Sequence, residues 1–333
     1  MKDIGLAMLL EKFFEEWLRN QKKVSPHTIS AYRDTFQLIL RYAERRLKKK
    51  PTQLVLADLD AEFICDFLTD LIKTRKVCAR TRNARLSAIK SFFLYVSFLE
   101  PEKGVFIGRV LAIPESRIVR KQIHFLTAEE IGTLLKAPDL DTWVGRRDRI
   151  MILVAIETGL RLTELLSLKW TDIYMTGSGG GSIQCIGKGR KERITPLSPS
   201  TAKILRLWKT ETEPLASAFI FPNNKGICMS SDCFQKQLEK YRILSVKHCE
   251  SLKTKKITPH MLRHTAAVNF LQAGIDLSTI AIILGHNSIE TTQIYLEANL
   301  EQKEKALKRL APKNIKGKRF KIDDKLVKYL KTL

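Results

Sequence analysis

The sequence predicts a two-domain, mainly α-helical protein with a small antiparallel β-sheet in its second domain. Apolar residues recur at helical spacing along most of the 333 residues, and a chain of this length favours two domains over one. Short alternating segments separated by glycine-rich turns occur between residues 172 and 197. Residues 101–124 combine prolines and glycines with a basic run, which is typical of an interdomain connection.

The predicted first domain spans residues 1–113 and is a helical bundle. In its first segment Leu9, Phe13 and Trp17 lie at helical spacing. Ser25 is a candidate N-cap, and Pro26 follows at the first helical position, where a missing N–H costs nothing. We expect helices over residues 6–19, 26–46, 56–73 and 79–100, the third capped by Asp58 or Asp60, and then a linker at residues 114–124.

The predicted second domain spans residues 125–312. Thr127 and Glu130 form a capping-box pattern at the start of its first helix. An apolar helix then runs to Thr158 and Gly159, and a new helix begins at Arg161. We expect strands at residues 172–175, 182–186 and 192–197, a further strand fragment at 219–222, and helices at 201–213 and 230–247.

The C-terminal part of this domain gathers the side chains with the most chemistry. A helix that begins at Pro259 carries His260 and Arg263 three residues apart, so both share one face near its positive end, which favours a phosphate. His286 follows the glycine that ends the next helix, and Tyr295 lies on a third helix. Two imidazoles, a guanidinium and a phenol brought to one place predict attack on a phosphodiester.

The charge indicates the kind of partner. The chain has 58 Lys and Arg against 35 Asp and Glu, a net charge of +23. This excess predicts a polyanion partner, DNA or RNA, because each neutralised phosphate releases counterions. No signal pattern precedes the first helix, and no apolar run approaches the roughly 20 residues of a membrane span. We therefore expect a cytoplasmic protein without membrane contact, with six reduced cysteines, Cys228 and Cys233 among the buried ones.

Four motifs occur in a fixed order: ETGLRLTELLSL, GKGRKERITPL, HMLRHT and LGHNSIETTQIY. Together they resemble the tyrosine recombinases, also called the phage integrase family, over residues 126–311. SPHTISAYRDTFQLIL and RTRNARLSAIKSFF resemble the family's N-terminal core-binding (SAM-like) domain. The resemblance implies a helical core-binding domain followed by a mixed α/β catalytic domain. It also implies an enzyme that cleaves and rejoins duplex DNA through a 3′-phosphotyrosyl intermediate.

The resemblance assigns the phosphate contacts to three residues. Arg161 and Arg263 would hold the non-bridging oxygens of the scissile phosphate with their forked donors, and His286 would hydrogen-bond it. Glu164, three residues after Arg161, would be the buried acid that orients the pocket. No metal or other cofactor is implied, because these cationic and imidazole groups would replace a Lewis acid.

The resemblance also assigns the proton transfers. Tyr295 would be the nucleophile, and since a phenol has a pKa near 10, it needs a cationic pocket or a base. His260 would assist proton transfer from Tyr295, and Lys188 would protonate the leaving 5′ oxygen. Arg190 and Lys191 crowd the same turn as Lys188, so either could be the proton donor or a contact to the DNA backbone.

Further basic residues are candidates for contacts with the DNA backbone at the start of the fourth helix of the first domain. They are Arg75, Lys76, Arg80, Arg82 and Arg85. The alternative for each of them is an ordinary solvated helix face.

Other side chains could imitate a site. His260 and His264 have the spacing of metal ligands, but the motif lacks the glutamate of HExxH and a third ligand, so we expect His264 to be a packed, hydrogen-bonded histidine. Tyr174, Tyr241 and Tyr329 are the alternatives to Tyr295 as nucleophile, and we expect Tyr174 in the core, Tyr241 at the surface and Tyr329 on the helix of the C-terminal tail.

The expected function is site-specific recombination for the integration, excision or transposition of a mobile element. The alternatives are a Xer-like resolvase of chromosome or plasmid dimers, and a strand transferase like a type IB topoisomerase or telomere resolvase. A DNA-binding module without activity and an RNA-binding protein have less support.

The implied assembly is a homo-tetramer on two double-stranded DNA sites, alone or with partner recombinases. The tail at residues 313–333 carries an apolar stripe on a short helix that needs a surface to dock on. It would dock on its own domain or be exchanged between neighbouring subunits. The stripe consists of Leu326, Tyr329, Leu330 and Leu333.

Overall fold

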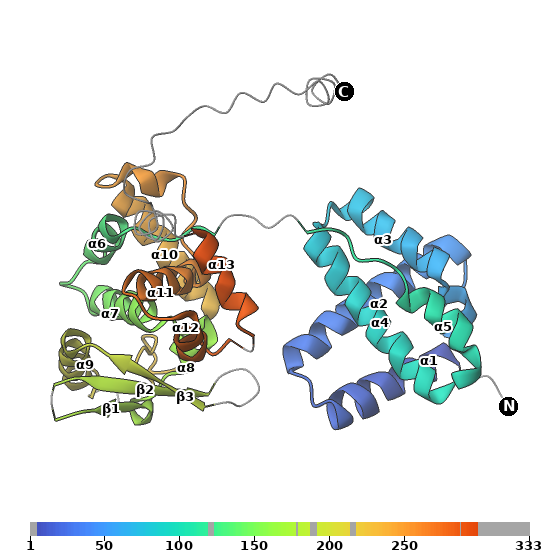
Figure 1. Cartoon of the computed structure of the whole chain (residues 1–333), viewed down its shortest axis with the longest axis horizontal. Coiled ribbons are helices and arrows are strands. Elements are labelled where there is room, and N and C mark those ends of the chain that lie inside the picture. The colour runs from blue at the N-terminus through green and yellow to red at the C-terminus, as the bar shows by residue number, and fades with distance from the viewer. Residues whose placement is uncertain are drawn as a thin grey trace, which may run out of the picture. The chain divides into compact units, whose positions relative to one another are not determined.

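The computed structural model describes residues 5–118, 123–177, 179–186, 192–213, 218–286 and 288–298. The chain divides into two compact units, Met1–Lys121 and Gln122–Leu333. The first is helical, and the second combines helices with a three-stranded antiparallel sheet (Figure 1), so the predicted fold class is confirmed. Lys188, Arg190, Lys191 and the predicted tail helix lie outside the described residues.

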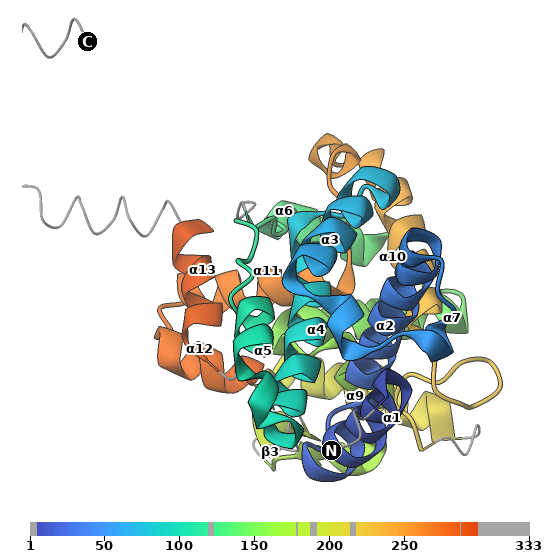
Figure 2. The ribbon, with the colours of Figure 1, turned by 90° about the vertical axis from the view of Figure 1, so that its right-hand side faces the viewer.

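The first unit is a bundle in which α4 contacts α2, α3 and α5 (Figures 1 and 2). Its α-helices are α1 (Leu6–Lys12), α2 (Pro26–Leu47), α3 (Ala61–Arg75), α4 (Ala79–Leu99) and α5 (Gly104–Leu111), with a π-helix at Phe13–Gln21 and 3₁₀ turns at Pro51–Gln53, Leu56–Leu59 and Pro101–Lys103. The expected caps are present. Ser25 Oγ accepts a hydrogen bond from the N–H of Thr28 at 3.2 Å, and Asp60 accepts one from Phe63 at 2.7 Å.

The first helix differs from the prediction of a continuous α-helix, because it becomes π-helical from Phe13 onward. In this wider spiral the adjacent rings of Phe13 and Phe14 both contact Phe36, at centroid distances of 6.1 and 5.9 Å. A π-helical stretch is rare and has no periodic signature that differs clearly from an α-helix over two turns. The apolar pattern therefore predicted a helix here but not its type.

Helix α5 corrects the interpretation of residues 101–124 as connection throughout. Gly104 and Gly108 suggested a loop, but Ile107 and Val110 are buried in the first core, and so is Ile113 just beyond the helix. Burial of these side chains outweighs the low helix propensity of the two glycines.

In the second unit α7 and α11 pack side by side, and the sheet has the order β1-β2-β3 (Figure 1). Its α-helices are α6 (Ala128–Lys136), α7 (Trp143–Thr158), α8 (Leu162–Ser167), α9 (Pro199–Thr212), α10 (Ser231–Val246), α11 (Pro259–Gln272), α12 (Leu277–Leu284) and α13 (Glu290–Ala298). Its strands are β1 (Ile173–Met175), β2 (Gly181–Ile186) and β3 (Glu192–Leu197), with 3₁₀ turns at Trp170–Asp172 and Glu250–Lys253. The strand fragment expected at 219–222 consists of two isolated bridges, Lys169 with Phe219 and Pro222 with Cys228.

Local signals in this unit were interpreted correctly. The side chains of Thr127 and Glu130 cap each other's backbone N–H groups, at 3.3 and 2.8 Å. Gly159 ends α7 with a left-handed φ of 62°, and α8 begins directly after Arg161. A separate apolar cluster, which includes Val268, Leu284 and Tyr295, joins α11, α12 and α13.

The burial of two tyrosines and two cysteines was predicted wrongly. Tyr174 is 53% exposed on β1, whereas Tyr241 is 3% exposed on α10. Tyr241 is buried because its hydroxyl donates to Oδ2 of the buried Asp148 at 2.7 Å, and no sequence spacing indicates that partner 93 residues away. Cys228 is exposed and Cys233 half-buried, although both were expected inside. Within the part of the chain that is described, no helix combines the length and apolar character needed to cross a membrane.

Candidate functional site

Helix α11 presents three neighbouring functional side chains from its first two turns. Thr258 caps the helix by accepting a hydrogen bond from the N–H of Met261 at 3.1 Å. His260 is exposed in the first turn, while Arg263 is buried and His264 half-buried one turn later. The rings of His260 and His264 are 4.2 Å apart between centroids, which follows from their spacing of four residues on one helix.

The C-terminal end of α12 brings Arg161 and Arg263 together. Arg161 Nη2 donates to the carbonyl of Gly285 at 2.6 Å, and Arg263 Nη2 donates to that of Leu284 at 2.6 Å. Arg263 Nη1 also donates to the carbonyl of Gly159 at 2.7 Å, at the end of α7. The last carbonyls of a helix have no partner within it and carry partial negative charge, so they stabilise guanidinium groups. Two helix ends thus place the two arginines that the sequence singled out.

Glu164 lies beneath Arg161 and is almost completely buried. Its carboxylate accepts hydrogen bonds from the backbone N–H of Arg161 at 2.7 Å and from Arg161 Nη1 at 3.0 Å. It also accepts two from Arg193, at 2.9 and 2.6 Å. Burial by itself would raise the pKa of Glu164, but the hydrogen bonds from Arg193 and from Arg161 lower it to about 2. The carboxylate is therefore charged at any physiological pH.

Arg193 was not among the candidate residues derived from the sequence. It lies on β3, where burial alternates along the strand, and its side chain faces inward opposite Cys185. That alternation was the available signal, since an arginine at an inward-facing strand position needs a buried partner.

Tyr295 is buried on α13, with 1% of its surface exposed. Its hydroxyl lies 2.9 Å from Nδ1 of His264, and its ring stacks on that of His286 at 6.4 Å between centroids. Burial raises the pKa of Tyr295, and nearby Arg263 opposes that rise. Burial, together with His260 and Arg263, lowers the pKa of His264 to about 4. A protonated phenol and a neutral imidazole are the forms that such a hydrogen bond requires.

A second residue of α13, Thr292, also contacts His286. Nδ1 of His286 lies 2.7 Å from the hydroxyl of Thr292. Burial, followed by the charges of Arg263 and Arg161, lowers the pKa of His286 to about 4. Partial burial of the His260 ring, followed by the charges of Arg263 and Arg161, also lowers the pKa of His260, although the residue as a whole is exposed. Among the described residues of this site, the positive charge near pH 7 therefore comes from arginine and not from histidine.

The basic residues expected to contact DNA in the first unit fall into two groups. Arg75, Lys76 and Arg80 are exposed, but the first two end α3 and do not begin α4 as predicted, Lys76 being its left-handed C-cap. Arg82 and Arg85 are half-buried and donate to backbone carbonyls of their own unit, Pro114 at 2.8 Å and Ala31 at 2.9 Å. Their charges therefore also hold the bundle together.

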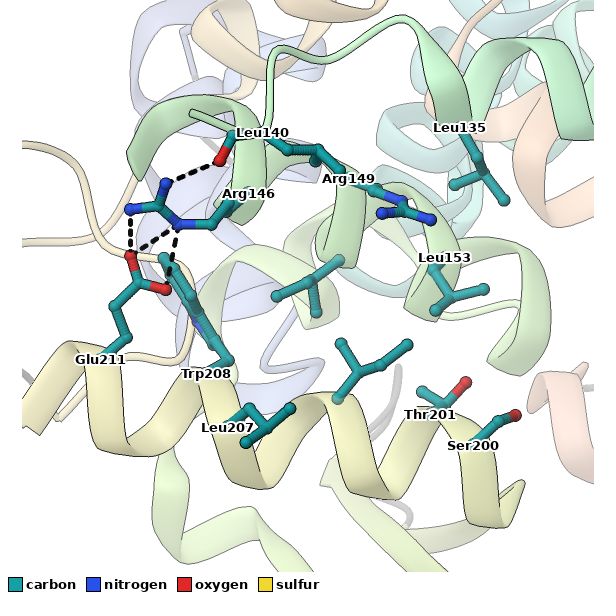
Figure 3. Close-up of a pocket in the computed structure, with 12 residues that line it drawn as sticks. Leu135, Leu140, Arg146, Arg149, Leu153, Ser200, Thr201, Leu207, Trp208 and Glu211 are labelled. Carbon is teal, nitrogen blue, oxygen red and sulfur yellow. Dashed lines mark hydrogen bonds and ion pairs between the residues drawn. The ribbon is translucent and has the colours of Figure 1, made fainter. Parts of the chain in front are cut away.

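An apolar pocket of about 430 Å³ lies between α7 and α9 (Figure 3). Leu153, Leu207 and Trp208 are among its lining residues, and Arg146 and Glu211 pair with each other at its rim at 2.5 Å. The pocket is separate from the site described above, because its lining includes none of Arg161, Arg193, Arg263, His260, His264, His286 and Tyr295.

Comparison with protein families gives two matches that together span most of the chain. Residues 124–302 match the phage integrase family, and residues 10–97 match the phage integrase N-terminal SAM-like domain. The second match lies within the helical unit, and the first lies within the unit that carries Arg161, Arg263, the histidines and Tyr295.

Individual relatives agree with this assignment. The chain is 47% identical over 332 residues to "Putative integrase/recombinase y4rC" of Sinorhizobium fredii, covering 100% of this chain and 99% of that protein. It is 30% identical to the tyrosine recombinase XerD of Pasteurella multocida, covering 91% and 96% of the two chains. Among solved structures, the XerH site-specific recombinase bound to palindromic difH substrate in a post-cleavage complex is 25% identical. Its TM-score is 0.70, with 89% of this chain and 82% of that chain covered.

Proposed function

The chain belongs to the phage integrase family of tyrosine recombinases, enzymes that recombine DNA by cleaving and rejoining its strands, and we propose that it does so through Tyr295. The observation that carries this proposal is the position of Tyr295. Its buried phenol contacts His264 and stacks on His286, and Arg263 is close enough to oppose the rise in its pKa that burial causes. Tyr174 and Tyr241 lack such surroundings, since Tyr174 is exposed on the sheet and Tyr241 pairs with a carboxylate.

The proposed reaction exchanges one phosphodiester for another. The phenolic oxygen of Tyr295 attacks the scissile phosphorus, the bond to the 5′ oxygen breaks, and a 3′-phosphotyrosyl link forms. Arg161 and Arg263 stabilise the charge on the non-bridging oxygens in the transition state, assisted by His286. The phenolic proton passes to a histidine and the 5′ oxygen takes a proton from Lys188. Because the link conserves a phosphate ester, a 5′ hydroxyl can reverse the step without ATP.

The structure distinguishes two histidines near Tyr295, and the sequence had singled out only one of them as its proton acceptor. His260 was expected to assist Tyr295, but the contact to the phenolic oxygen is made by His264, and His260 contacts His264. Both rings belong to the proposed path, with His260 on the solvent side.

Covalent trapping tests this proposal. A duplex with a nick just beyond the cleavage position loses the short 5′-hydroxyl strand, so the protein stays attached and survives denaturation by SDS. We expect an adduct with the wild-type protein and with the control Tyr174→Phe, and none with Tyr295→Phe. An adduct that persists in Tyr295→Phe would exclude this nucleophile.

The proposed partners are a specific double-stranded DNA site and further copies of the chain. The relatives that support this are recombinases, one of them solved on its substrate DNA. We propose a tetramer on two sites, in which residues 313–333 dock on a neighbouring subunit, and a location with cellular DNA in the cytoplasm. Deleting residues 323–333 should impair synapsis of two sites more than binding of one site, measured by gel shift. Equal losses of both would contradict the exchange of the tail.

The proposed biological role is the movement of a mobile element. It is supported by a relative of matching length whose name describes an integrase/recombinase. A dimer resolvase and a type IB topoisomerase-like strand transferase use the same chemistry. Excision of a marked element in cells supports the first role, resolution of plasmid dimers the second, and relaxation of supercoils without a specific site the third.

A further inference from the structure

Arg193 is a buried guanidinium that has no part in the proposed reaction. It is 8% exposed, and all of its described contacts are made inside the protein. Nη1 and Nη2 hold both oxygens of Glu164, and Nε donates to the carbonyl of Ile283 at 2.9 Å. A planar fork that serves three acceptors at once is a contact that lysine cannot reproduce.

The end of α12 holds three arginines at fixed spacing. The consecutive carbonyls of residues 283–285 each accept a hydrogen bond from a different one: Arg193 at 2.9 Å, Arg263 at 2.6 Å and Arg161 at 2.6 Å. These arginines come from β3, from α11 and from the residue before α8. Arg193 is the one of the three whose two terminal nitrogens both donate to a carboxylate.

The balance of charge gives Arg193 its role. Glu164 contacts two guanidinium groups, but its hydrogen bonds to Arg193 are bidentate and that pair is the more deeply buried. Because the Arg193–Glu164 pair is neutral as a unit, Arg161 retains its positive charge for an incoming anion. Without Arg193, the carboxylate would neutralise Arg161 at the same distance of 3.0 Å.

We propose that Arg193 is a positioning residue that occupies Glu164 and thereby keeps Arg161 available to the scissile phosphate. This inference rests on the proposed function, since it requires Arg161 to bind that phosphate. It predicts that the harm done by losing Arg193 comes from the carboxylate left behind, and that removing the charge of that carboxylate restores activity.

Four proteins test this: the wild type, Arg193→Met, the double variant Arg193→Met/Glu164→Gln, and the control Arg146→Met. The control also removes an arginine from an ion pair of this unit, since Arg146 pairs with Glu211 outside the site. Adduct formation is measured in single turnover at saturating protein on the nicked duplex, and the affinity for DNA is measured separately. Thermal unfolding identifies any variant that fails to fold.

The expected result is a rate for Arg193→Met lowered by about tenfold or more, with DNA affinity changed by less than about twofold. The double variant should recover at least about half of the loss on a logarithmic scale, and Arg146→Met should match the wild type. If Arg193 only fills space, the double variant loses further contacts and reacts no faster than Arg193→Met, which would overturn the proposal.

A second readout needs no cleavage. Inorganic phosphate should raise the Tm of the wild type and of the double variant more than that of Arg193→Met. Only in Arg193→Met is the charge of Arg161 compensated by a Glu164 carboxylate that has no other partner. Equal increases in all three would refute the role of Arg193. A wild-type protein that forms no adduct would instead refute the proposed function, so the two failures can be told apart.

Discussion

At the scale of single residues, the site combines neutral histidines with cationic arginines around a protonated phenol. Tyr295, His264 and His286 are packed by α11 and α13, and burial keeps each of them in its uncharged form. We expect the phenol to give up its proton only as it attacks a phosphate held by Arg161 and Arg263.

The pKa of His264 leads to a prediction about stability. Because this pKa is about 4 in the folded protein and about 6.5 in an unfolded chain, the unfolded state takes up the proton first as the pH falls. Folding is therefore not penalised by His264 above pH 6.5. Between pH 6.5 and pH 4 the free energy of unfolding falls progressively, because the unfolded state binds the proton and the folded state does not. We expect the Tm of His264→Phe to fall less between pH 7 and pH 5 than that of the wild type.

His264→Phe should also change stability at pH 7, where the histidine is neutral in both the folded and the unfolded state. The variant should be less stable at pH 7 by about 0.5–1.5 kcal/mol, because Tyr295 loses its hydrogen-bond partner. Parallel Tm curves for the two proteins between pH 7 and pH 5 would show that His264 does not titrate with the expected shift.

At the scale of elements, the end of α12 is the part on which the site depends. Gly285 has a φ of 64°, and a Cβ added to it would lie 2.9 Å from Nη1 of Arg193. Gly285→Ala should therefore lower stability by about 1–2 kcal/mol from backbone strain and displace Arg193 as well, which slows adduct formation. The matched control is Gly132→Ala, because a Cβ there meets nothing within 4 Å and lies inside α6.

The control should be stabilised by about 0.5–1 kcal/mol, since alanine is the better helix former. Thermal unfolding and the rate of adduct formation together check both variants. If Gly285→Ala kept the stability and rate of the wild type, the end of α12 would not set the spacing of the arginines.

Elements were predictable from the sequence where the signal is local. The mutual caps of Thr127 and Glu130 and the glycine that ends α12 depend on residues within one turn of each other. The contact of His264 with Tyr295 joins residues 31 positions apart, and Arg193 reaches Ile283 across 90 positions. Tertiary packing brings these residues together, and the periodicity of apolar residues in the sequence does not predict such contacts. Helix α5 was not predicted for the same reason, because its two glycines indicate a loop and only tertiary packing buries its apolar side chains.

At the scale of the whole molecule, the two units have separate cores. One cluster of buried apolar residues lies within residues 6–113, and the other two lie within residues 126–262 and 267–295. The net charge of +23 extends over both units, so a large share of DNA affinity is expected to be electrostatic and to weaken with salt.

Two arginines of the first unit allow contact with DNA to be tested separately from stabilisation of the bundle. Arg80 is exposed, whereas Arg85 donates to Ala31 and Thr35 within the bundle. We expect Arg80→Gln to reduce the slope of log affinity against log salt by about 1 and to leave the Tm unchanged. Arg85→Gln should lower the Tm and change the slope less. Binding titrations at several salt concentrations check this, and an unchanged slope for Arg80→Gln would remove Arg80 from the DNA interface.

The proposed reaction joins Tyr295 covalently to the 3′ end of cleaved DNA. Its most direct test is to digest the trapped adduct with nuclease and protease and to identify the peptide that carries the residual nucleotide by mass spectrometry. We expect a 3′-nucleotide on the peptide that contains Tyr295. A nucleotide on another residue, or one joined through its 5′ phosphate, would contradict it.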